Sequence, residues 1–173
     1  MCSSDLSKGA LGWYERAAEQ GHAEAHFRLG LLHSREDSLY GDRAAAVRHF
    51  EAAAERGDAR AQYALAQALY AGRGAEPAPE RAVDWLRRSA LQGYHRAQAR
   101  LADLYATGRN IEHDEASAIA WLRLASEQHA RLYGNALDAL ERLATEEARE
   151  LAATREHALR AAIEGSRGNL ETP

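Results

Sequence analysis

The sequence repeats itself with a period of 36 residues, and this period constrains the fold more than any local propensity does. Gly21, Gly57 and Gly93 stand 36 residues apart in two consecutive steps. The phrase Tyr-Glu-Arg-Ala-Ala-Glu-Gln-Gly that ends at Gly21 returns as Phe-Glu-Ala-Ala-Ala-Glu-Arg-Gly at Gly57. A repeat of this length cannot bury its apolar face alone, so neighbouring repeats must stack. The sequence therefore predicts an array of stacked helix pairs.

Several columns of the repeat carry the same residue type in successive units. The columns are Ala10, Ala46, Ala82 and Ala118; Leu29, Leu65, Leu101 and Leu137; and Trp13, His49, Trp85 and Trp121. Within each unit, such apolar positions are spaced by three and four residues, which places them on one stripe of a helix. We expect these columns, tryptophans included, to form a continuous packed core.

Helix ends recur at the same register. Asp42 and Asp114 precede the first helices of two units, where Asp is a favoured N-cap, and Pro79 opens a third. The glycines at 21, 57 and 93 stand where each first helix should stop, since glycine takes the left-handed conformation without a Cβ clash. Gly72 and Gly108 are expected to end two of the second helices. Each unit is thus predicted as helix, tight turn, helix, looser loop.

The pattern Ala-x-x-Trp-Tyr-x-x-Ala-Ala-x-x-Gly-x-x-x-Ala-x-x-x-Leu-Gly, read from residue 10 to 30, resembles the Sel1-like repeat, a relative of the tetratricopeptide repeat. The resemblance implies an all-α fold: an α/α solenoid (superhelix) of about four 36-residue helix-turn-helix repeats with a C-terminal capping helix. We expect units at 10–45, 46–81, 82–117 and 118–144, a disordered or truncated leader at 1–9, a cap at 145–164 and a tail at 165–173. Glu36 and His129 depart from the pattern, because glycine is expected at both positions.

Composition excludes several classes of protein. The chain has 46% hydrophobic and 28% charged residues and a net charge of −4, with no basic footprint for nucleic acid and no apolar run of the ~20 residues that a membrane span needs. Cys2 is the only cysteine, so no intrachain disulfide is expected. Residues 1–6 carry no secretion signal, which makes a cytoplasmic location the default expectation. A truncated N-terminus, or a lipoprotein starting at Cys2, would instead indicate a periplasmic origin.

Chemistry-bearing patterns are few. His22 and His26 have a spacing that suits metal ligands, but the equivalent positions of the other units hold Asp58 and Tyr94, and Gln62 and Gln98. We therefore interpret both histidines as solvent-facing or turn residues and expect no metal and no cofactor. No nucleophile elbow or other catalytic signature is present, so the chain is not expected to be an enzyme.

Columns that differ between units are free to bind. On the first helices we predict a partner-binding face that comprises Arg16, Glu19, Arg48, Glu55, Arg87, Arg88, Leu91 and Leu124. The resemblance implies a non-catalytic scaffold or adaptor that binds a protein or peptide on a concave face, and the arginines at 87 and 88 suggest an acidic segment in that partner. Two alternatives stay open: an immunity or inhibitor protein that blocks one toxin or enzyme, and a hydrolase of cell-wall or β-lactam-like substrates, by analogy with cysteine-rich family members. The oligomeric state is not indicated.

Overall fold

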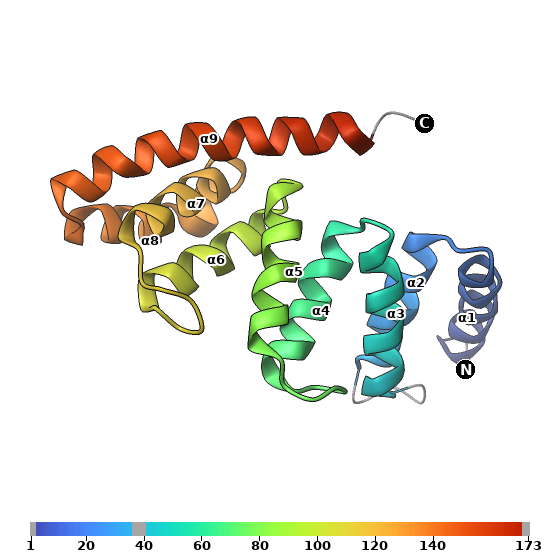
Figure 1. The fold of residues 1–173 in the computed structure, drawn as a ribbon. Helices are drawn as coiled ribbons and strands as arrows, with labels where there is room; N and C mark the ends of the chain where they lie inside the picture. Colours follow the sequence, from blue (N-terminus) through green and yellow to red (C-terminus); the bar gives the residue numbers. More distant parts are fainter. Residues whose placement is uncertain (1–2, 36–40, 171–173) are drawn as a thin grey trace. The chain divides into compact units, whose positions relative to one another are not determined.

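The computed structural model describes residues 3–35 and 41–170, which form nine α-helices and no strand (Figure 1). The helices are α1 Ser3–Glu19, α2 Ala23–His33, α3 Arg43–Glu55, α4 Ala59–Ala71, α5 Pro79–Leu91, α6 His95–Thr107, α7 Glu115–Gln128, α8 Ala130–Leu143 and α9 Glu146–Leu170. The prediction of an all-α repeat fold is confirmed.

The chain forms two compact units, Met1–Trp85 and Leu86–Pro173, whose boundary falls within α5. The terms "first unit" and "second unit" denote these two, and the 36-residue elements are called repeats. In the first unit α1 packs on α2, α2 on α3, and α3 on α4. In the second unit α7 packs on α6, α8 and α9. Each helix therefore packs mainly on helices close to it in the sequence, as expected of a repeat array.

The helix ends follow the local signals in the sequence. The Asp42 carboxylate accepts a hydrogen bond from the Ala45 amide at 3.0 Å, and Asp114 accepts one from the Ser117 amide at 3.1 Å. The helix α5 begins at Pro79, as predicted. Gly21, Gly57 and Gly93 have φ angles of 84°, 87° and 85°, and Gly72 and Gly108 take the left-handed conformation at the ends of α4 and α6. The predicted glycine turns are therefore confirmed.

The alanine and leucine columns form the core. Ala46, Ala82, Ala118, Leu29, Leu65 and Leu101 are each at most 2% exposed. The tryptophan column behaves differently: Trp121 is 5% exposed, but Trp13 is 68% exposed. The prediction of a uniform tryptophan core is wrong at Trp13, because α1 packs on α2, whereas α7 is enclosed by α6, α8 and α9.

In two repeats, a buried glutamine at the same position links the two helices of the repeat. Gln62 donates to the carbonyl of Ala54 at 3.1 Å, and Gln98 donates to that of Ala90 at 3.2 Å. The two glutamines are 4% and 1% exposed. This column also holds His26, which is half-buried. Its assignment as a solvent-facing or turn residue is therefore wrong, because it lies inside α2 and its side chain is hydrogen-bonded to the backbone of Ala18, near the end of α1.

Gly30 permits a close approach between α2 and α3. A Cβ atom at this position would lie 2.5 Å from the Phe50 ring, so no other residue fits without movement of that ring. In the second unit the equivalent pair, 72 residues later, is Ala102 and Leu122. Alanine is larger than glycine and leucine is smaller than phenylalanine, so the change on one helix compensates for the change on the other.

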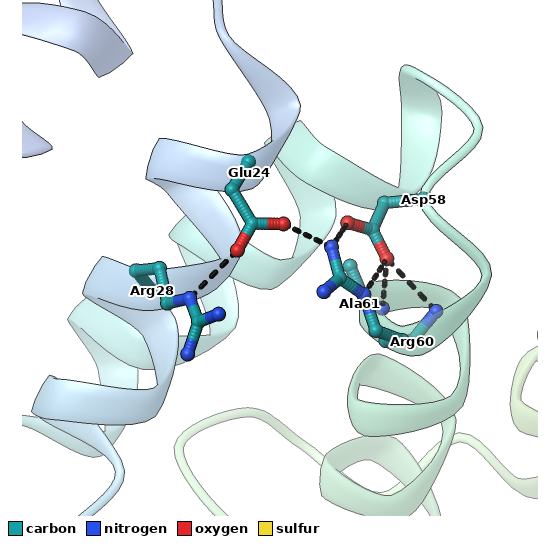
Figure 2. A network of polar contacts seen from close by, with 5 residues as sticks. All are labelled: Glu24, Arg28, Asp58, Arg60 and Ala61. Carbon is teal, nitrogen blue, oxygen red and sulfur yellow. Dashed lines mark hydrogen bonds and ion pairs between the residues drawn. The ribbon is translucent and has the colours of Figure 1, made fainter.

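A polar network joins α2 to α4 (Figure 2). Glu24 lies between Arg28, at 2.6 Å, and Arg60. Arg60 also pairs with Asp58 at 2.6 Å, and the Asp58 carboxylate caps α4 by accepting from the Ala61 amide at 3.1 Å. The second helices of two consecutive repeats are therefore linked directly.

The two ends of the described chain differ from expectation. The helix α1 begins at Ser3, so residues 3–9, expected to belong to a disordered or truncated leader, are helical. The helix α9 continues past Gly165 to Leu170, beyond the predicted end at 164. Ile163, which is 8% exposed, anchors its last turns by tertiary packing. Thr145 caps α9 by accepting from the Ala148 amide at 3.1 Å. Glu36 lies outside the described residues.

Candidate functional site

The residues predicted to bind a partner divide between the two units. Arg16, Glu19, Arg48 and Glu55 lie on α1 and α3 of the first unit, and the other four lie in the second. All six charged members are exposed, Leu91 is half-buried and Leu124 is 4% exposed. The charged positions are thus available to a partner in each unit taken by itself.

In the first unit the arginines of this face contact their own helices or caps. The Arg16 guanidinium lies 4.6 Å from the centre of the exposed Trp13 ring, and its Nε donates to the Gly12 carbonyl at 3.3 Å. Arg48 approaches the Asp42 carboxylate at 3.9 Å. Exposed pairs of this kind are weak, so they leave the guanidinium groups available for exchange with a partner's carboxylates.

In the second unit the sequence-based prediction fails at Leu124. This residue was expected on an open face, but its side chain is buried because α9 lies along α7 (Figure 1). Arg160 and Ile163 of α9 line the same cavity as Leu124. Leu124 is therefore a packing residue. Arg87, in contrast, is exposed, and its Nη2 donates to the Tyr105 hydroxyl at 3.5 Å.

The contact between α7 and α9 combines apolar packing with ion pairs. Ala116 and Ile119 of α7 pack with Ala152 of α9 in one cluster. Around this cluster, arginines pair with carboxylates at both ends of α7 and along its length. The pairs between the two helices are Arg155 with Asp114, Arg160 with Glu127, and Arg123 with Glu156 at 3.5 Å; within α9, Arg160 also pairs with Glu156 at 2.7 Å. The contact of α9 with α7 thus shows how apolar packing and ion pairs can bind a helix to the first helix of a repeat.

Two buried positions of α7 are more exposed on α3. Ala120 and Leu124 are 0% and 4% exposed, and Leu124 lines a cavity with residues of α9, whereas their equivalents 72 residues earlier, Arg48 and Ala52, are exposed and half-buried. The next position of the face holds Glu127 on α7, which pairs with Arg160 of α9, and Glu55 on α3, which is exposed. The same helix face is therefore occupied by a helix in one unit and open in the other.

A second kind of surface, which the sequence analysis missed, lies on the second helices. In the first unit a groove of about 200 Å³ has Phe50 of α3 as its floor and Ala64 and Ala68 of α4 as its wall. Ser34, Arg43 and Arg73 also line it. Small side chains beside a large one leave this hollow because the helices cannot close further over the ring.

The same groove recurs in the second unit. It measures about 280 Å³ and lies over Leu122 of α7, between Ala106 of α6 and Ala136 and Leu140 of α8. These four residues are the 72-residue equivalents of Phe50, Ser34, Ala64 and Ala68. The lining residue that carries a charge here is Asp103, in place of the two arginines. The sequence does show small residues that recur along the second helices. A repeated residue type does not reveal how much space lies between two packed helices, so the groove could not be predicted from it.

Three histidines meet between α2 and α3. The Nδ1 atoms of His26 and His49 are 3.2 Å apart, and the His33 ring stacks on His49 with centroids 5.4 Å apart. Burial lowers the pKa of His26, and burial together with the neighbouring His26 lowers the pKa of His49. Within the described part of the chain, no group of three or more His, Cys, Asp or Glu residues is arranged to hold a metal ion. None of the described helices combines the length and hydropathy that a membrane span requires.

Comparison with known proteins identifies the repeat. The family model for the Sel1 repeat matches residues 1–22, 23–58, 59–94 and 95–129. A solved structure of c5321, described as a protective antigen present in uropathogenic Escherichia coli strains displaying an SLR fold, is 29% identical with a TM-score of 0.78 over 94% of this chain and 36% of that one. A Sel1 repeat protein from Oxalobacter formigenes is 30% identical with a TM-score of 0.63 over 68% of this chain and 49% of that one. The chain thus spans about a third to a half of the length of these relatives. No curated protein matches it.

Proposed function

Because this chain belongs to the Sel1 repeat family, whose repeats commonly mediate protein–protein interaction, we propose that it is a protein-binding scaffold or adaptor whose open first-helix face holds a helical segment of a partner. One observation carries the proposal: the chain's own α9 packs on α7, while the equivalent face of α3 is exposed at Arg48 and Glu55. A helix that lies in a groove between helices is a recurrent mode of peptide recognition.

The chemistry of the open face specifies the partner. On α7 the buried positions are the apolar residues Ala120 and Leu124, and Leu124 lies beside α9. On α3 the equivalents include Arg48, and Glu55 lies about two turns further on, so a partner helix there must present charges of both signs. Such pairs act mainly on association rate and specificity, and they are screened over about 8 Å at physiological salt.

This function is recognition without a reaction, in keeping with a family of generally non-catalytic repeat scaffolds. The inhibitor and hydrolase roles stay predictions from the resemblance. An inhibitor would form a one-to-one complex that abolishes the activity of its target, whereas an adaptor would leave that activity unchanged.

Site-specific photocrosslinking in cells of the source organism tests the proposal. A photoreactive amino acid at Ala52, on the α3 face, should yield a discrete crosslinked partner. The same group at the exposed Glu76, in the loop before α5, serves as the matched control. The double reversal Arg48→Glu with Glu55→Arg should abolish the crosslink. Equal crosslinking from both positions, or a crosslink that survives the reversal, would contradict a partner on this face.

A further inference from the structure

The recurrent groove on the second helices has a size that suits one amino-acid side chain. At about 200 Å³, the groove of the first unit is smaller than the roughly 300–1,000 Å³ of small-molecule sites. Its floor and wall are apolar: the Phe50 ring and the methyl groups of Ala64 and Ala68. An apolar side chain of a peptide would remove this surface from water.

The rim of this groove is basic. Arg43, at the start of α3, and Arg73, just after the end of α4, both line it and are both exposed. The polar residues beside them, Ser34 and Gln67, are uncharged. A guanidinium group at the edge of an apolar pocket favours a carboxylate next to the inserted side chain, because charge-assisted hydrogen bonds are the stronger kind.

The equivalent groove of the second unit lacks this charge. Its charged lining residue is Asp103, which pairs with Arg100 at 2.6 Å, and the residue equivalent to Ser34 is Ala106. The two grooves therefore share their shape, from the same columns of the repeat, but differ in the sign of the rim. A ligand selected by both shape and charge would distinguish them.

We infer that the groove over Phe50 binds a short acidic peptide segment of a partner, with an apolar side chain inserted between α3 and α4 and an adjacent carboxylate paired with Arg73. This surface is separate from the first-helix face proposed above. The two proposals stand on different residues, and either can fail alone.

Titration with three labelled nine-residue peptides tests the inference by fluorescence anisotropy on the full chain. The first peptide has a central leucine flanked by glutamates, the second has lysines in place of the glutamates, and the third has a central serine. The acidic leucine peptide should bind at least about tenfold more tightly than either of the others. Arg73→Glu should remove this preference.

Variants that fill the groove decide whether binding occurs there. Ala64→Trp should abolish binding of the acidic leucine peptide, and Ala136→Trp, at the equivalent position of the second unit, should leave it unchanged. Since Ala64→Trp could perturb packing, Gln67→Trp at the exposed rim serves as a second blocking variant, and the thermal melt of each variant shows whether it is folded. Equal affinity for acidic and basic peptides, binding that survives both blocking variants, or no binding at about 1 mM peptide would overturn the inference.

Discussion

Glu24 and Arg60 occupy the same position of two consecutive repeats, 36 residues apart, and form an ion pair with each other (Figure 2). The Arg60 guanidinium also lies 4.5 Å from the centre of the Phe27 ring. The hydrogen bond from Arg60 is the main cause that lowers the pKa of the Glu24 carboxyl. Neighbouring repeats are thus linked directly when the same position holds an acidic residue in one repeat and a basic residue in the next.

The first prediction concerns the strength of this link. Both side chains are partly exposed, Arg60 at 40% and Glu24 at 49%, so their coupling should be at most about 1 kcal/mol. A double-mutant cycle with Glu24→Gln and Arg60→Gln, measured by urea unfolding, gives this value. The coupling should shrink in high salt. A salt-independent coupling well above that size would mean that the pair is effectively desolvated.

The second prediction tests the turn. Gly57 has a φ angle of 87°, which a β-branched residue adopts only with strain. Gly57→Val should therefore destabilise the protein by about 1–2 kcal/mol or more. Gly134→Ala, at an interior position of α8 where an added Cβ meets nothing, is the control and should be neutral or slightly stabilising. An unchanged melting temperature for the valine variant would contradict the left-handed assignment.

The third prediction concerns pH. Burial, with help from Arg56, lowers the pKa of His26, and burial, His26, His33 and Arg48 lower that of His49. The folded state therefore binds protons less readily than the unfolded state, whose histidines titrate near 6.5. The stability contributed by neutral histidines is present above pH 6.5 and is lost as the pH falls below that value.

The repeat itself supplies the matched variant for this test. In the next repeat, 36 residues later, the position of His26 holds Gln62 and the position of His49 holds Trp85. His26→Gln with His49→Trp should therefore retain the hydrogen bond to Ala18 and flatten the dependence of the melting temperature between pH 7 and about pH 5, relative to wild type. The same slope in both proteins would show that other groups, such as His95, dominate acid destabilisation.

The fourth prediction separates packing from surface on the second unit. Leu124→Ala should destabilise by about 2–5 kcal/mol, because a buried leucine is removed next to α9. Arg88→Glu changes an exposed residue and should shift stability by no more than about 0.5 kcal/mol. Chemical unfolding of both variants checks this contrast. A surface-like effect at Leu124 would mean that α9 does not cover α7 in solution.

The sequence by itself determined the repeat, the turns and the helix ends inside the array, although not the start of α1 or the end of α9. Signals such as Asp42, Pro79 and Gly57 act on the backbone within a few residues, so one sequence suffices to place them. The period then placed Leu29, Leu65 and Leu101 in the core, because equivalent positions in a stacked array meet equivalent neighbours.

Only the tertiary structure decided which equivalent positions are covered. Trp13 and Trp121 share a column, yet one is exposed and the other buried, and Leu124 is enclosed because α9 packs along α7. The groove over Phe50 likewise depends on side-chain volumes contributed by α3 and α4 together. Burial and open space arise between helices, and a periodic pattern describes each helix but not what packs against it.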